Sequence, residues 1–163
     1  MSTPDNQTPP VDYRPAGFTT LTPFLCVDGA AKAIDFYVEV FGAAVVSRMD
    51  APDGTVAHAE LQFELGRLQL SDPMEGYGLA AHDGGAPATH SLAIYVPDCD
   101  AVVAAAERAG AIVREQPSTF VTGDRFGSTL DPFGVRWSVL TRVEEVSDEV
   151  AQQRVQEWLA AQS

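Results

Sequence analysis

His58 and Glu60 are the side chains whose types and spacing point most directly to chemistry. They lie two positions apart in HAELQFEL, where apolar and polar residues alternate as in a half-buried strand. Because such side chains project from the same strand face, the carboxylate could orient the imidazole as a general base. The pair could also supply two metal ligands, or form the solvated face of an edge strand. A tight metal site would need a third donor, for which His82 and Glu64 are the candidates.

Two further side chains could recognise a ligand. Arg125, in TGDRFG, carries a planar guanidinium that can clamp a carboxylate or phosphate. It could equally form a salt bridge with Asp124, Asp131 or Glu60. Tyr95 could offer a phenol donor or a stacking surface, or could fill a cavity. The chain has no GxSxG elbow and no P-loop, and no GxGxxG turn follows a strand, so hydrolase and nucleotide-binding chemistry have no supporting motif.

The elements that must position these residues occur twice along the chain. A strand, a helix, a strand and a hairpin are predicted over about residues 19–73, and the same order returns over about 89–142. A shift of 69 positions aligns Val27 with Val96, the last strand residue before each helix. We therefore predict an α+β protein of two βαβββ units. One helix covers one sheet face in each unit, so the two bare faces can form a single trough suited to a small molecule.

Local signals predict where the helices begin and end. Asp28 is placed to cap the helix AAKAIDFYVEVFG, which Gly42 would end as a C′ glycine. Either Asp98 or Asp100 would cap the second helix, in CDAVVAAAERAG. Ser147 would cap a third helix, in DEVAQQRVQEWLAAQ. These signals are local and are therefore independent of how the two units pack together.

Four segments resemble a known family: TPFLCVDGAAKAIDFYVEVFGA, HAELQFELGRLQLSD, LAIYVPDCDAVVAAAERAGA and GDRFGSTLDPFGVRWSVL. The DPFG turn is the most specific feature among them. Together they make residues 19–142 similar to the glyoxalase/bleomycin resistance/dioxygenase (vicinal oxygen chelate) superfamily, and within it to the short glyoxalase-like branch. The resemblance implies two βαβββ repeats forming a curved mixed sheet around a central cavity, with an extra C-terminal helix. It also implies small-molecule binding or lyase-like chemistry, and a homodimer.

The resemblance further implies where a metal would bind. Metal-using members carry His or Glu at one inward position on each of four strands, and the matching positions here are Thr22, Gln69, Ser91 and Ser138. Hydroxyl and amide oxygens bind transition metals weakly unless a carboxylate, thiolate or imidazole accompanies them. We therefore expect no cofactor, with a divalent metal at an atypical site near His58 as the alternative.

Strand alternation adds neighbours to those four positions. The residues predicted to bind a ligand are Thr22, Phe24, Gln69, Ser91, Tyr95, Arg125, Arg136 and Ser138. This mixture predicts a metal-free small-molecule binding protein of the glyoxalase/bleomycin resistance type, with antibiotic sequestration as one such role. The alternative is a lyase, isomerase or dioxygenase of the same fold that uses His58 and Glu60 as a base or metal site. A third hypothesis is an interaction domain that docks through Val155, Trp158 and Leu159.

Composition narrows the expected partners and location. The formal charge of −13, from 23 acidic and 10 basic side chains, disfavours nucleic acid and anionic membranes. No apolar run reaches the roughly 20 residues of a membrane helix, and the polar residues 1–17 do not resemble a secretory signal, so we expect a cytoplasmic protein. We divide the chain into a flexible tail (1–17), a vicinal oxygen chelate domain (18–142) and a C-terminal helix (143–163). Exposed sheet edges also favour a homodimer.

Overall fold

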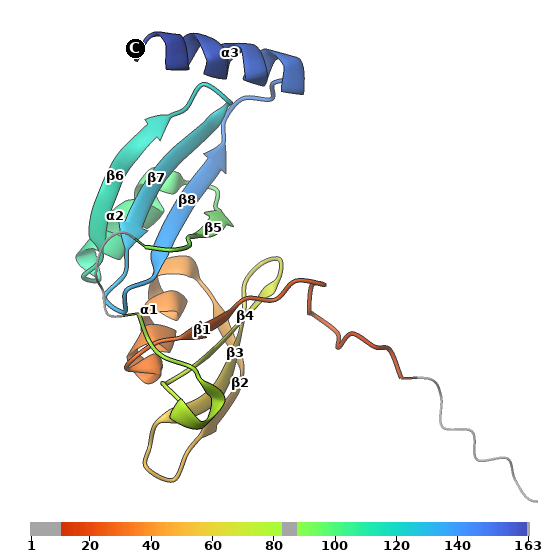
Figure 1. The fold of residues 1–163 in the computed structure, drawn as a ribbon, viewed down its shortest axis with the longest axis vertical. Helices are drawn as coiled ribbons and strands as arrows, with labels where there is room; N and C mark the ends of the chain where they lie inside the picture. The colour runs from red at the N-terminus through yellow and green to blue at the C-terminus, as the bar shows by residue number, and fades with distance from the viewer. Residues whose placement is uncertain (1–10, 83–87, 163) are drawn as a thin grey trace, which may run out of the picture.

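The computed structural model describes residues 11–82 and 88–162, which contain two successive βαβββ units. The first unit consists of β1 (Phe24–Cys26), α1 (Ala30–Phe41), β2 (Ala44–Asp50), β3 (Val56–Gln62) and β4 (Arg67–Ser71). The second consists of β5 (Leu92–Tyr95), α2 (Cys99–Arg108), β6 (Ile112–Thr119), β7 (Asp124–Leu130) and β8 (Arg136–Arg142). A short 3₁₀ helix, η1 (Glu75–Tyr77), lies between the units, and α3 (Asp148–Ala160) follows them (Figure 1). The predicted α+β class is confirmed, whereas residues 1–10 of the predicted tail lie outside the described residues.

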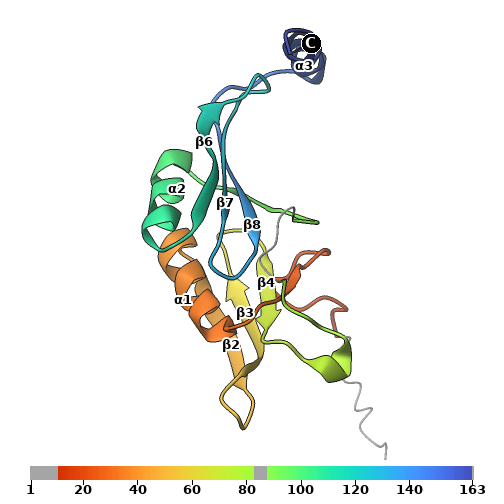
Figure 2. The same ribbon diagram turned by 60° about the vertical axis from the view of Figure 1, so that its left-hand side comes forward.

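Each unit forms its own four-stranded mixed sheet. The strand orders are β1-β4-β3-β2 and β5-β8-β7-β6. In both sheets the first strand of the unit pairs in parallel with the fourth, and the other neighbours are antiparallel. Figure 2 shows α1 and α2 on the same side of the strands, so the helix-free faces of both sheets lie on the opposite side. The chain therefore builds two sheets with two open faces, rather than one continuous sheet.

The repeat extends to the pairing of individual residues. A shift of 69 carries the pair Leu25↔Leu70 onto Ile94↔Val139, in the parallel part of each sheet. In the antiparallel hairpins the shift is 68, and both hairpins have a register irregularity at the same place, after Val45 in β2 and after Val113 in β6. The change from 68 to 69 falls in the β3–β4 and β7–β8 turns, because the second turn is one residue longer.

The first turn of α1 is capped from a distant strand. The N-cap residue is Gly29, with φ of 82°, and it makes no side-chain cap. Instead Asp72, just after β4, accepts from the Gly29 and Ala30 N–H groups at 2.9 and 3.0 Å through Oδ1, and from the Val56 N–H at 2.7 Å through Oδ2. The prediction that Asp28 caps this helix is therefore wrong. The Asp72 carboxylate already accepts hydrogen bonds from the backbone N–H groups at the start of α1, which Asp28 was expected to cap.

The other predicted helix ends are as the local signals indicated. Asp98 caps α2 by accepting from the Ala101 N–H at 3.0 Å, and Ser147 caps α3. Gly42 ends α1 in the left-handed conformation, with its N–H donating to Tyr37 and Val38 carbonyls. A glycine is suited to this position because a side chain disfavours positive φ.

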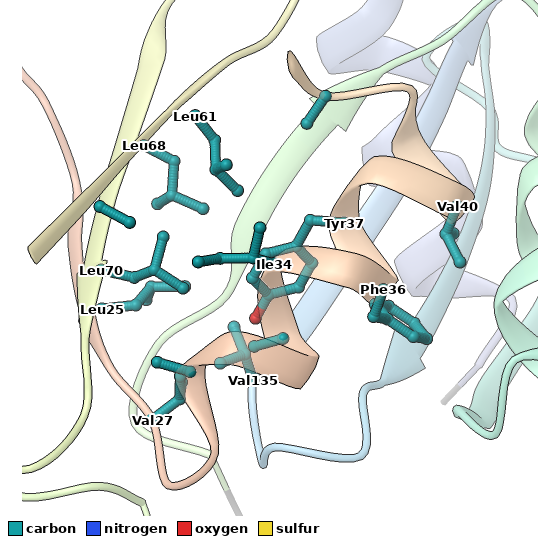
Figure 3. Packing of buried hydrophobic residues seen from close by; sticks show 14 of the residues in the cluster. Leu25, Val27, Ile34, Phe36, Tyr37, Val40, Leu61, Leu68, Leu70 and Val135 are labelled. Carbon is teal, nitrogen blue, oxygen red and sulfur yellow. The ribbon is translucent and has the colours of Figure 1, made fainter. Parts of the chain in front are cut away.

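The hydrophobic core joins the two units. Figure 3 shows Leu61, Leu68 and Leu70 of the first sheet pointing toward one side of α1. Tyr37 on α1 is fully buried and also meets the second unit, because its ring lies 5.3 Å from that of Trp137 in β8. Burying a large apolar side chain contributes about 1.5–3 kcal/mol, so this shared core fixes how the two units sit against each other.

A single buried carboxylate completes this junction. Asp131, the aspartate of the DPFG turn, accepts through Oδ2 from the Tyr37 hydroxyl at 2.8 Å and from the Trp137 indole N–H at 3.0 Å. Its Oδ1 accepts from the Phe133 and Val135 N–H groups, both at 2.9 Å. Burial raises the pKa of Asp131, although these four hydrogen bonds oppose the rise. The carboxylate thus ties α1 of the first unit to the last hairpin of the second.

Helix α3 extends beyond the second sheet (Figure 1). None of its residues is buried. It contacts the β6–β7 turn and the residues after β8. The Trp158 ring centroid lies 5.4 Å from that of Phe120, and Arg154 pairs with Glu144 and donates to the Val121 carbonyl at 3.3 Å. Its predicted apolar stripe is thus largely exposed, and α3 contributes little to the core.

We predict that a chain ending at Val146 keeps its fold. The loss in unfolding free energy should be about 1 kcal/mol, because one exposed aromatic pair is worth about 0.5–1.5 kcal/mol. Urea denaturation followed by circular dichroism measures this difference. Loss of a cooperative transition in the shortened chain would contradict the expectation and would make α3 part of the folding unit.

Candidate functional site

The helix-free face of the first sheet carries most of its polar side chains. We call it the first open face, formed by Phe24, Cys26, His58, Glu60, Gln62, Arg67 and Gln69. The pairings Phe24↔Gln69 and Glu60↔Gln69 place these side chains in one row across β1, β4 and β3. Ala59 and Leu61 are buried against α1, whereas their neighbours on β3 are partly exposed. The predicted alternation of this strand is therefore confirmed.

His58 and Glu60 lie side by side on this face, as predicted. The His58 Nε2 is 3.6 Å from Glu60 Oε1, slightly beyond hydrogen-bond distance. Glu60 accepts instead from Arg67 Nη1 at 2.9 Å, and Arg67 Nε donates to Gln62 Oε1 at 3.1 Å. The side chains of His58, Glu60 and Arg67 are 25%, 20% and 15% exposed, so all three remain accessible. The strongest partner of Glu60 is thus an arginine that the sequence did not single out.

The second open face has an equivalent arginine. We define this face by Ser91, Ala93, Tyr95, Ser128, Arg136, Ser138 and Leu140. Arg136 pairs with Glu115 Oε2 at 2.9 Å and lies 3.3 and 3.4 Å from the hydroxyls of Ser128 and Ser138. Ser138 also hydrogen-bonds to Ser91 at 2.9 Å. The structure therefore brings together three of the predicted ligand-binding residues here: Ser91, Arg136 and Ser138.

Arg67 and Arg136 occupy the same position in their repeats. Each is the first residue of the fourth strand of its unit, and the 69-residue shift aligns them. Arg67 pairs with Glu60 of the first open face, and Arg136 pairs with Glu115 of β6, which lies opposite Ser128 in the strand pairing. Applying that shift to Arg136 would have identified Arg67 as a candidate from the sequence. Each open face thus presents a guanidinium that is already oriented by a carboxylate.

A cleft of about 580 Å³ lies where the two units meet. One wall is the β3–β4 turn and the start of β4, Phe63–Leu68, and the other is β5 and the residues after it, Ala93–Pro97. The rings of Phe41 and Trp137 also line it, with centroids 4.5 Å apart. A concave, largely apolar space with a few polar groups is the usual form of a small-molecule site. Tyr95 is the predicted ligand-binding residue that lines this cleft.

The eight predicted ligand-binding residues do not line a single trough. Phe24 and Gln69 lie on the first open face, with Thr22 in the segment before β1, whereas Ser91, Arg136 and Ser138 lie on the second. The reason is that the chain forms two separate four-stranded sheets, and the cleft is lined by the β3–β4 turn of the first unit and by β5 of the second rather than by both open faces.

Arg125 lies on the opposite, helix-facing side of the second sheet. Its guanidinium pairs with Asp100 of α2, with Nη2 donating to Oδ1 at 2.6 Å, and Nη2 also donates to the Pro117 carbonyl at 3.2 Å. Hydrogen bonds from Arg125 lower the pKa of Asp100. The partner of Arg125 is thus Asp100 rather than Asp124, Asp131 or Glu60, and Arg125 is separated from the other candidates.

The four positions that the family resemblance assigns to metal ligands do not fit a transition metal. The Thr22 hydroxyl donates to the Thr19 carbonyl at 3.2 Å, and the hydroxyls of Ser91 and Ser138 bond to each other. Gln69 contributes only an amide. Among residues 11–82 and 88–162, no three His, Cys, Asp or Glu side chains gather into a possible metal site. That the protein works without a metal stays a prediction.

Cys26 is the thiol on the first open face. Burial, followed by the negative charge of Asp72, raises its pKa. The thiol is therefore protonated at neutral pH and is a poor nucleophile.

None of the described helices combines the length and apolar character needed to cross a membrane.

Comparisons with known proteins agree with this architecture. A family model described as the Glyoxalase/Bleomycin resistance protein/Dioxygenase superfamily matches residues 18–139. An uncharacterized protein of Mycobacterium bovis is 40% identical over 136 residues, which cover 80% of this chain and 88% of that protein.

Solved structures add similarity of fold. TioX from Micromonospora sp. superposes with a TM-score of 0.61 at 23% identity, covering 77% of this chain and 99% of that one. A gene product of Arabidopsis thaliana gives 0.60 at 26% identity, covering 75% and 98%. With the family model spanning both repeats, the chain belongs to the glyoxalase/bleomycin resistance protein/dioxygenase superfamily.

Proposed function

We propose that this protein binds a small organic molecule without converting it, and that the cleft between the two units is the main contact surface. The observation that carries the proposal is the cleft of about 580 Å³, which combines aromatic rings with the Arg67 guanidinium and the Tyr95 phenol. Its volume lies within the range of about 300–1,000 Å³ that is usual for such sites.

The donor chemistry of the open faces supports binding rather than metal-assisted catalysis. The side chains at Thr22, Gln69, Ser91 and Ser138 donate and accept hydrogen bonds but are weak metal ligands. Tyr95 is 60% exposed, so its ring is available to stack on a planar ligand. We therefore propose a binding role of the antibiotic-sequestering kind, for flat or peptide-like molecules.

Replacing Tyr95 by alanine should weaken binding about three- to tenfold, because an aromatic contact is worth about 0.5–1.5 kcal/mol. Calorimetry with a panel of planar and peptide-like antibiotics measures the affinity, and product analysis detects any turnover. Tyr77→Ala is the matched control, since Tyr77 lies on η1 outside the cleft and is 80% exposed. An unchanged affinity in Tyr95→Ala, or no binding by the natural chain, would contradict the proposal.

An enzyme of the same fold is the second candidate. The specific observation is the pair of His58 and Glu60, which lie 3.6 Å apart on an accessible face. The same panel distinguishes the two functions. Turnover by the natural chain that is lost in His58→Ala would replace the binding role with base catalysis.

We further propose a homodimer and a cytoplasmic location. Edge strands β2 and β6 expose apolar side chains, with Val45 at 48%, Met49 at 56% and Ile112 at 59%. A second copy would cover such edges. Light scattering that shows only monomers would contradict the homodimer.

A further inference from the structure

Residues 13–20, which we call the N-terminal strap, lie against the first open face. The Phe18 ring packs on the guanidinium of Arg67, whose Cζ lies 4.5 Å from the ring centroid. Between the strap and the sheet is a cavity of about 560 Å³, lined on the sheet side by Glu60, Arg67 and Gln69. The strap therefore covers the accessible arginine of this face with an aromatic ring from the chain itself.

Among the described residues, no hydrogen bond joins the strap to the sheet. Within the described part of the chain, its hydrogen bonds stay among residues 12–22, such as Arg14 Nη1 to the Phe18 carbonyl at 2.5 Å and Phe18 N–H to the Pro15 carbonyl at 3.2 Å. Its polar attachment to the sheet is thus the Phe18–Arg67 contact. A cation–π contact at a partly exposed site is worth only about 0.5–1 kcal/mol, so a modest competitor can replace it.

The contacts of Arg67 define which part of its guanidinium could bind a ligand. Glu60 and Gln62 orient the guanidinium through Nη1 and Nε, while Nη2 has no acceptor among the described residues. A Cβ atom at Gly17 would lie 2.6 Å from Nη2, and Gly17 has a φ of 86° that disfavours any side chain. The strap therefore approaches closely enough to cover both the ring-stacking face of the guanidinium and its remaining donor.

We propose that Phe18 occupies the place of a ligand's aromatic ring, and that this face binds a planar aromatic carboxylate. The ring would stack on the Arg67 guanidinium and the carboxylate would accept from Nη2. The strap is then an intramolecular competitor that must leave before the ligand binds. This inference rests on the proposed small-molecule binding function, extends the binding surface from the cleft to the first open face through the shared Arg67, and names the ligand class.

The probe is 2-naphthoate, titrated into the full chain by calorimetry, with cyclohexanecarboxylate as the non-aromatic comparison. Phe18→Ala should tighten naphthoate binding about two- to fivefold, because the binding-competent state no longer competes with the closed strap. Arg67→Met should weaken it at least about tenfold, since a charge-assisted pair is lost. Arg48→Met is the matched control, because Arg48 pairs with Asp50 on β2 away from the open face and should leave binding unchanged.

Gly17→Ala provides an independent test that keeps both Phe18 and Arg67. It should also tighten binding, because alanine disfavours the φ of 86° that Gly17 adopts in the closed strap. In the Arg67→Met background, Phe18→Ala should have no effect, since ligand and ring then have nothing to compete for. Weaker binding in Phe18→Ala or Gly17→Ala would overturn the competition and make the strap part of the binding surface.

Chymotrypsin cleavage after Phe18 reports the strap directly. Saturating naphthoate should speed cleavage in the natural chain, because the displaced strap becomes accessible. Slower cleavage would overturn the inference, since the strap would then close over the ligand. If naphthoate binds no better than cyclohexanecarboxylate while other panel molecules bind, the ligand class fails and the binding function survives. If no molecule binds the natural chain or Phe18→Ala, both fail.

Discussion

Replacing Asp131 by alanine is expected to lower the free energy of unfolding by about 3–5 kcal/mol, because four donors lose their shared acceptor at the junction of the two units. Asp131 is 4% exposed, and its carboxylate accepts four hydrogen bonds. Alanine would leave the Tyr37 hydroxyl and the Trp137 indole N–H without their acceptor inside the core that joins the two units. A buried donor without a partner costs about 1–3 kcal/mol. Urea denaturation followed by tryptophan fluorescence measures the loss.

The matched control is Asp53→Ala. Asp53 is also a turn aspartate, and it accepts from the Thr55 N–H at 3.0 Å and hydroxyl at 2.7 Å. Because it is exposed, water can replace both hydrogen bonds, so this variant should lose far less stability. Tyr37→Phe should fall between them, at about 1 kcal/mol, because it removes one hydrogen bond and keeps the ring. Equal losses in Asp131→Ala and Asp53→Ala would show that the buried carboxylate does not hold the units together.

Much of the fold could be predicted because its signals are periodic and local. Alternation along β3 placed His58 and Glu60 on one face and Ala59 and Leu61 on the other, and the structure agrees. The 69-residue shift reappears in the strand pairing. The facing of the β3 side chains follows from alternation within one segment, and the repeat follows from comparing two segments. A single sequence contains both kinds of information.

The site was predicted less well because it depends on how the two units pack together. The contact of Tyr37 with Trp137 sets the position of the second sheet, and no local pattern reports that distance. The sequence predicts that Arg125 clamps an anionic ligand because a guanidinium precedes the second hairpin, whereas in the structure it pairs with Asp100, 25 residues away on α2. Arg67 was missed although the repeat aligns it with Arg136.

Replacing Asp72 by alanine is the second large expected effect, a loss of about 2–4 kcal/mol in unfolding free energy. Its side chain is the acceptor for the Gly29, Ala30 and Val56 N–H groups. Unlike an ordinary cap, it joins three segments: the start of α1, the start of β3 and the end of β4. Loss of a helix cap alone costs about 1 kcal/mol, and unpaired buried amides add to it.

Asp28→Ala is the control that separates this arrangement from local capping. Asp28 is exposed and lies just before Gly29, so sequence signals favour it as the cap, yet the amides at the helix start bond to Asp72. We expect Asp28→Ala to leave stability unchanged. Urea denaturation of both variants decides between the two aspartates. A large loss in Asp28→Ala together with a small loss in Asp72→Ala would restore the local cap. The opposite result would mean that α1 begins where a carboxylate 43 residues later holds its first amides.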